Sequence, residues 1–177
     1  MLSRTVAKVA STLYLHAESP LRLSQISRAS GLPHQMAAAA LQTLEKRGLV
    51  SRIAKDGYDA FEANRNSRYF IPAYLTALAD LPLDEALRSQ RVMSVYVYGS
   101  MATPDLATSQ SDIDLLIVGD VKNKDILRES LNVIGDHLGR QIDPLILTPE
   151  EVGQAQARED SHLTAALAGI NIRGEKL

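Results

Sequence analysis

The sequence predicts an α+β protein made of two parts, and three observations lead to that prediction. Charge is divided along the chain: residues 1–75 hold ten Lys/Arg and five Asp/Glu, whereas residues 76–177 hold nine and sixteen, within a net charge of −2. The hydrophobic pattern changes at Pro82 from helices with a hairpin to alternating helices and strands. A length of 177 residues suits one ordinary domain or two small ones.

Composition excludes several classes of protein. Hydrophobic residues make up 45% and charged residues 23%, which is typical of a globular protein. The chain has no cysteine, so disulfides, cysteine zinc sites and thiol chemistry are excluded. No apolar run approaches the 18 residues or so of a membrane span, and the first residues lack the pattern of a signal peptide. We therefore expect a cytoplasmic protein with no membrane partner.

The sequence pattern of the N-terminal part predicts a winged helix-turn-helix over residues 1–66, followed by a linking helix over 67–81. Helices are expected over residues 2–17, 24–30 and 34–47, and strands over 49–54 and 58–63, around the turn signal Lys55-Asp56-Gly57. Ser24 is expected to cap the second helix. The inward face of the third helix is expected to hold Met36, Ala40, Leu41 and Leu44.

A basic part with this order of elements fits double-stranded DNA. The candidate contacts are Gln35 and Gln42 on the third helix, because glutamine can bond to base edges, and Arg52 and Lys55 in the hairpin, which suit phosphates. A dimerisation or partner-docking module remains the alternative, and the charge asymmetry also fits a merely solvated surface.

The sequence pattern of the C-terminal part, residues 82–177, predicts alternating helices and strands. Strands are expected over residues 92–100, 112–119 and 141–148, and helices over 84–91 and 123–138. Thr148, Pro149 and Glu151 are typical of a helix start, with a capping threonine, a proline in the first turn and a glutamate three residues on.

Two aspartates in the second of these strands carry the main chemical signal. Gly99-Ser100 is followed, after eleven residues, by Asp112-Ile113-Asp114. Residues i and i+2 of a strand share a face at roughly 7 Å spacing. Two carboxylates about 6 Å apart repel by about 3 kcal/mol at an effective dielectric near 20. A divalent cation offsets that repulsion, and Mg²⁺ (or Mn²⁺) binds one or two carboxylates together with substrate phosphates.

Gly99 and Ser100 are the candidate phosphate-binding residues. Glycine allows a close approach of the backbone to an anion, and the serine hydroxyl and following N–H groups can donate to phosphate oxygens. Asp143, near the start of the third strand, adds a third carboxylate, and the Pro144 that follows it fits an edge strand or a bulge. Three carboxylates could hold two metals, one on the leaving pyrophosphate and one at the nucleophile, with Asp143 helping to deprotonate the attacking hydroxyl.

The stretches YGSMATPDLATSQSDIDLLIVG and QIDPLIL resemble the polymerase-β-type nucleotidyltransferase superfamily, and most of all its minimal members, often called MNT proteins. The resemblance covers about residues 82–177, and the whole chain is similar to the subset with an N-terminal winged helix. It implies a mixed sheet flanked by helices, binding of an NTP and Mg²⁺, and transfer of NMP to an acceptor. Many minimal members act as antitoxins beside a HEPN-type toxin, and some adenylylate a tyrosine on that toxin.

The resemblance thus implies a Mg²⁺-dependent nucleotidyltransferase that transfers AMP from ATP to a protein acceptor, with a HEPN-type toxin as candidate partner. Asp112, Asp114 and Asp143 are the predicted catalytic and metal-binding residues. Residues 101–105, MATPD, differ from the basic stretch that many relatives carry there. This difference keeps an alternative open: a DNA-binding transcription regulator whose second domain senses nucleotide or is inactive.

Overall fold

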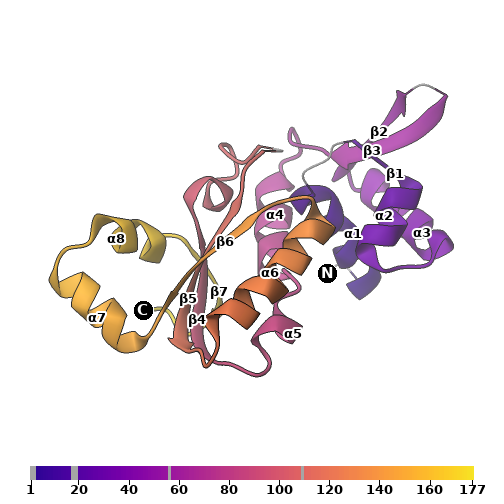
Figure 1. The fold of residues 1–177 in the computed structure, drawn as a ribbon. Helices are drawn as coiled ribbons and strands as arrows, with labels where there is room; N and C mark the ends of the chain where they lie inside the picture. The colour runs from indigo at the N-terminus through magenta and orange to yellow at the C-terminus, as the bar shows by residue number, and fades with distance from the viewer. Residues whose placement is uncertain (1–2, 17–19, 56, 109) are drawn as a thin grey trace. The chain divides into compact units, whose positions relative to one another are not determined.

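The computed structural model divides the chain into two compact units, Met1–Leu81 and Pro82–Leu177 (Figure 1). It describes residues 3–16, 20–55, 57–108 and 110–177. Helices and strands are mixed in both units, which confirms the α+β class. No helix in these described stretches is long and apolar enough to cross a bilayer.

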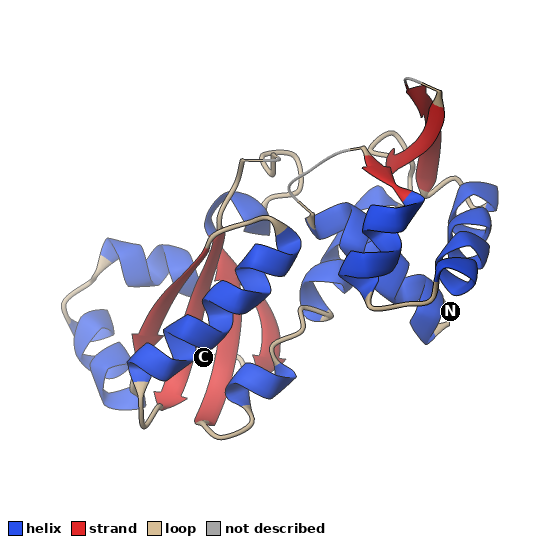
Figure 2. Cartoon of the chain, turned by 45° about the vertical axis from the view of Figure 1, so that its right-hand side comes forward, coloured by secondary structure: helices blue, strands red, loops and turns tan. Residues whose placement is uncertain are grey.

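The first unit consists of helices with a small antiparallel sheet, ordered β1-β3-β2 (Figure 2). Its elements are α1 (Arg4–Leu15), β1 (Leu21–Arg22), α2 (Leu23–Ser30), α3 (His34–Lys46), β2 (Val50–Lys55), β3 (Tyr58–Ala63) and α4 (Phe70–Ala79). These match the expected order of elements, while the winged-helix and linking-helix assignments stay predictions.

An aromatic stack joins α1 to α4 in the core of this unit. The Tyr14 and Phe70 rings stack with centroids 5.4 Å apart, and Phe70 and Tyr74 follow at 5.9 Å. The Tyr14 hydroxyl donates to the Leu49 carbonyl at 2.9 Å, so α1 is also tied to the chain just before β2. All three aromatic residues are buried, and α4 therefore shares the core of the first unit.

Two local predictions in this unit are wrong. Met36 is 44% exposed, and Ala37 is buried in its place. The buried stripe of α3 runs through Ala37, Ala40, Leu41 and Leu44, which is one helical face, and Met36 lies one residue off it. Ser24 is not a cap, because α2 begins at Leu23; the N–H of Arg22 is satisfied by the Gln25 side chain at 2.8 Å.

The second unit is a mixed four-stranded sheet ordered β6-β5-β4-β7, in which only the β5–β6 pair is parallel among the described strands. Its elements are α5 (Asp84–Leu87), β4 (Arg91–Tyr98), a 3₁₀ turn (Gly99–Ala102), β5 (Ile113–Asp120), α6 (Lys124–Leu138), β6 (Ile142–Leu147), α7 (Pro149–Ala157), α8 (Ser161–Leu167) and β7 (Ile170–Gly174). The predicted start of α7 is confirmed, since Thr148 accepts from the Glu151 N–H at 3.1 Å and Glu151 accepts from the Thr148 N–H at 2.7 Å.

Helices cover both faces of this sheet (Figure 1). Side chains of β4 and β5 form one apolar cluster with α7 and α8; its buried members are Tyr96, Tyr98, Leu116, Val118, Val152, Leu163 and Ala166. The opposite face meets α6, where a Cβ on Gly135 would lie 3.5 Å from Cγ1 of Ile142. The sheet is therefore held between two helical layers, and the predicted site residues gather at one end of it.

The buried Tyr14 hydroxyl predicts a pH dependence of stability at alkaline pH. Burial raises the pKa of Tyr14 to about 12, from 10.0. The folded protein keeps the Tyr14 hydroxyl proton to a higher pH than the unfolded chain does. The contribution of this group to the free energy of unfolding is therefore fully present below pH 10 and is lost as the pH rises through 12. We expect the wild type to lose more unfolding free energy than Tyr14→Phe as the pH is raised across this window, in urea titrations. Parallel losses in the two proteins would contradict this.

Candidate active site

The predicted site residues gather where β4 ends and where β5 and β6 begin. Gly99 and Ser100 directly follow β4. Asp112 directly precedes β5, Asp114 is the second residue of β5, and Asp143 is the second residue of β6. The antiparallel β4–β5 pair and the parallel β5–β6 pair together bring these positions to one end of the sheet.

Asp114 lies at the centre of this group. It pairs in register with Asp143 on β6 and with Tyr98 on β4, so all three side chains share one face of the sheet. This is the face that α7 and α8 cover, because Tyr98 belongs to their apolar cluster. Asp114 is half-buried, whereas Asp112 and Asp143 are exposed. The structure thus brings Asp114 and Asp143 side by side, and Asp112 is near enough for its charge to raise the pKa of Asp114.

Gly99 leaves room for the Asp114 carboxylate. Its φ of +65° is a left-handed conformation, and a Cβ built on it would lie only 2.1 Å from Asp114 Oδ2. Both features favour glycine. The backbone then turns through the 3₁₀ segment, and the Ser100 carbonyl accepts from the Thr103 N–H at 3.1 Å. The residue predicted to admit a phosphate also makes space for an aspartate of the site.

Burial and neighbouring negative charges disfavour ionisation of Asp114 and Tyr98 at this end of the sheet. The pKa of Asp114 is raised, first by burial and then by the charges of Asp143 and Asp112, while His162 opposes this rise. Burial also raises the pKa of Tyr98, and Asp114 and Asp143 raise it further. No residue in the described ranges donates a hydrogen bond or ion pair to the carboxylates of Asp112, Asp114 or Asp143.

Two further residues lie at the site. Tyr98 and His162 form an edge-to-face ring pair with centroids 5.6 Å apart, and His162 reaches the site from α8. The sequence predicts Tyr98 as a sheet residue that could also contact a base, because it lies next to Gly99. It gives no signal for His162, which has no metal-ligand partner at helical or hairpin spacing and reads as a structural histidine.

The residues fit a divalent metal by donor chemistry. Carboxylate oxygens suit Mg²⁺ and Mn²⁺, and no described residue donates a hydrogen bond to the carboxylates of Asp114 and Asp143 or forms an ion pair with them. Within the described residues, however, no group of three or more His, Cys, Asp or Glu side chains is close enough to form a complete metal cage. Mg²⁺ does not need one, because it retains waters and takes oxygens from substrate phosphates.

The candidate DNA contacts lie in the first unit. Gln35 and Gln42 are both exposed on α3, and Gln42 lines a hollow of about 410 Å³ between α3, β1 and the β2–β3 hairpin. Lys55 is the last residue of β2, and its side chain lies outside the described part of the structure. These assignments stay predictions.

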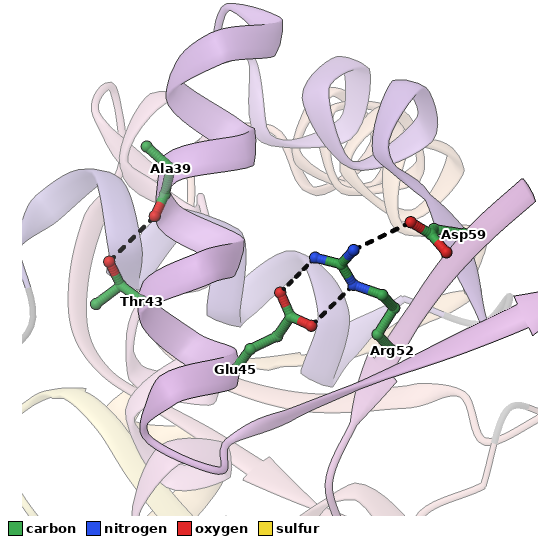
Figure 3. Close-up of polar contacts among 5 residues, drawn as sticks. All are labelled: Ala39, Thr43, Glu45, Arg52 and Asp59. Carbon is green, nitrogen blue, oxygen red and sulfur yellow. Dashed lines mark hydrogen bonds and ion pairs between the residues drawn. The ribbon is translucent and has the colours of Figure 1, made fainter.

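Arg52 has carboxylate partners within its own unit (Figure 3). Its Nε and Nη2 atoms donate to the two oxygens of Glu45 at 3.0 and 2.9 Å, and Nη1 donates to Asp59 at 3.1 Å. These interactions raise the pKa of Arg52, with the Glu45 hydrogen bond first among the causes. The guanidinium therefore joins α3 to the hairpin, and phosphate binding would have to break these ion pairs.

The raised pKa of Asp114 predicts that its carboxylate reduces stability. Because folding raises this pKa, the free energy of unfolding is highest below the pKa of Asp114 in the unfolded chain. It falls as the pH rises through the pKa of Asp114 in the folded protein. We expect Asp114→Asn to melt a few degrees higher than wild type at neutral pH without metal, which corresponds to about 1 kcal/mol or less, and to lose this advantage in acid, below the ordinary aspartate pKa. Asp120→Asn, at the exposed far end of β5, is the control and should not change the melting temperature. A lower melting temperature for Asp114→Asn at neutral pH would contradict the interpretation.

The close contact of Gly99 with Asp114 predicts that any side chain at position 99 lowers the stability of the fold. We expect Gly99→Ala to destabilise the protein by about 1 kcal/mol or more in urea unfolding, because of the positive φ and the contact with Asp114. Gly153→Ala is the matched control, since Gly153 lies in α7 with no atom within 4 Å of the place its Cβ would take, and alanine favours a helix. Equal effects of the two substitutions would refute a special role for Gly99.

A family model matches most of the second unit. Residues 83–165 match the family described as the nucleotidyltransferase domain. No curated protein matches the chain. Among solved structures, a mutant of the toxin–antitoxin complex MntA-HpeT is similar at 16% identity and a TM-score of 0.36, covering 53% of this chain and 72% of that one. The family match includes Gly99, Ser100 and all three aspartates, so the predicted site lies within the region that is similar to nucleotidyltransferase domains.

Proposed function

We propose that this protein transfers a nucleoside monophosphate, AMP from ATP, to a hydroxyl group of a protein acceptor in a Mg²⁺-dependent reaction. The attacking oxygen forms a bond to the α-phosphorus, the bond to pyrophosphate breaks, and the hydroxyl proton passes to a base. The observation that carries the proposal is the in-register pair Asp114–Asp143 beside Gly99, inside the matched family region.

Each site residue has a role that its position suits. Asp112, Asp114 and Asp143 would hold Mg²⁺ or Mn²⁺, which supplies charge neutralisation at the phosphates. Asp143 is exposed on β6 and can accept the proton of the attacking hydroxyl. Gly99 and Ser100 bind the phosphates through backbone N–H groups and the Ser100 hydroxyl.

The acceptor is the least constrained part of the proposal. A HEPN-type toxin is the candidate that the family resemblance implies, and the reaction would then take place in the cytoplasm. The exposure of Asp112 and Asp143 supports a large acceptor, because a macromolecular hydroxyl can approach from solvent.

Label transfer from each α-labelled NTP tests the proposal. With Mg²⁺ and a native host lysate as the acceptor pool, we expect a labelled band with ATP. The band should fall by at least roughly a thousandfold with Asp112→Ala/Asp114→Ala, since these residues are the proposed metal ligands. Asp120→Asn is the matched control and should label normally. Full labelling by the double variant would refute the assignment.

A DNA-binding regulator is the second candidate, and the exposed Gln35 and Gln42 on α3 are the observations in its favour. Absence of any labelled band, with a working positive control, would favour this candidate. The second domain would then bind nucleotide without transferring it, or serve only in assembly.

A further inference from the structure

Arg140 is a buried cation beside the proposed site. It lies in the turn between α6 and β6, and only 9% of it is exposed. Among the described residues it is the one charged side chain that the structure buries. Burying a guanidinium is costly unless its N–H groups find acceptors, so its partners indicate its role.

The backbone of Arg140 is held firmly by the end of α6. Gly139 adopts a left-handed conformation with φ of +63°, and the Arg140 N–H donates to the Gly135 carbonyl at 2.9 Å, closing the helix. A Cβ on Gly135 would lie 2.4 Å from the Arg140 carbonyl oxygen, so the turn packs closely on α6. The side chain therefore extends from a fixed corner.

The guanidinium of Arg140 binds the loop that leads into Asp112. Its Nη1 atom donates to the Thr108 carbonyl at 2.9 Å and to the Ser111 carbonyl at 2.5 Å. Thr108 and Ser111 also contact each other, since the Thr108 N–H donates to Ser111 Oγ at 3.0 Å. Ser111 immediately precedes Asp112, so the guanidinium holds the residue next to this aspartate.

The turn between α6 and β6, which contains Arg140, also holds the residue that follows Asp112. The Ile113 N–H donates to the Gln141 carbonyl at 2.9 Å. Asp112 is thus placed between two residues, Ser111 and Ile113, that are bound by Arg140 and Gln141. Asp143 lies only two residues beyond Gln141, so the same turn that holds Asp112 leads directly into the third carboxylate.

We infer that Arg140 is a positioning residue of the metal site: it fixes Asp112 relative to Asp143. The inference rests on the proposed function, because it concerns the same carboxylates. Asp114 needs no such support, since its place is set by the strand register. Asp112 lies outside β5, so its position depends on the neighbouring Ser111, whose carbonyl Arg140 binds. Arg140 does not contact the reacting atoms and is not a catalytic residue.

Binding of Mn²⁺ alone, followed by electron paramagnetic resonance of the free ion, tests this role. Arg140→Met keeps most of the side-chain length and removes every donor. We expect its dissociation constant for Mn²⁺ to rise about 10–100-fold, the effect usual for residues that orient metal ligands. Arg140→Lys should give a smaller rise, because it keeps the charge and some donors. Arg128→Met is the matched control, since Arg128 is exposed and pairs only with Asp125 among the described residues, at 3.4 Å.

Melting temperatures in metal-free buffer separate folding from positioning. A purely structural role would lower the melting temperature of Arg140→Met and leave Mn²⁺ affinity within about twofold of wild type, which would overturn the inference. If Arg140→Met does not fold, an unchanged affinity in Arg140→Lys would overturn it. If the wild type itself binds no Mn²⁺ and Asp114→Asn behaves identically, the proposed function fails together with this inference.

Discussion

The parallel pairing of β5 with β6 is the constraint on which the site depends. Six residue pairs run from Ile113–Ile142 to Val118–Leu147, and the pair Asp114–Asp143 is the second of them. A slip of one residue would turn one aspartate to the opposite face. The remaining pairs are apolar and mostly buried, and burying each such side chain contributes roughly 1.5–3 kcal/mol. That sum exceeds the repulsion of about 3 kcal/mol between two nearby carboxylates. Hydrophobic packing therefore keeps together two charges that would separate in water.

The position of β6 at the edge of the sheet makes this arrangement workable. Pro144 lacks an N–H and would break the hydrogen bonding of a central strand, but among the described strands β6 has a neighbour on one side only, which is one of the two arrangements, edge strand or bulge, that the proline predicted. An edge strand also leaves Asp143 exposed, whereas Asp114, one strand further in, is half-buried with a raised pKa. Two residues of the same type thus differ in exposure because one lies on an edge strand and the other on an inner strand.

Local signals predicted most elements, and long-range contacts explain what was missed. Strand β3 matches its predicted span, α6 ends at Leu138 as predicted, and Thr148 forms the predicted box with Glu151. Met36 was wrongly predicted to face inward because the packing of α3 on α1 decides which face of the helix is buried, and that face is shifted by one residue from the predicted one. His162 reaches the site from α8, and Arg140 reaches Ser111, next to Asp112, from the turn after α6. Both contacts span sequence separations over which spacing carries no information. The three aspartates could be found because their motif lies at the predicted starts of two strands, which the sheet brings together.

Charge in the first unit shows why composition predicts less than contacts do. The excess of basic residues favours a polyanion, yet Arg52, a phosphate candidate in the hairpin, already binds Glu45 and Asp59. A charge that is paired within the fold releases little free energy on meeting DNA, because the existing ion pairs must be lost first. The surface ion pairs themselves contribute little stability, typically about 0–1 kcal/mol, so their main effect is on geometry: they hold the hairpin against α3. DNA binding by this unit would therefore depend on the side chains that these contacts leave exposed, Gln35 and Gln42, rather than on net charge.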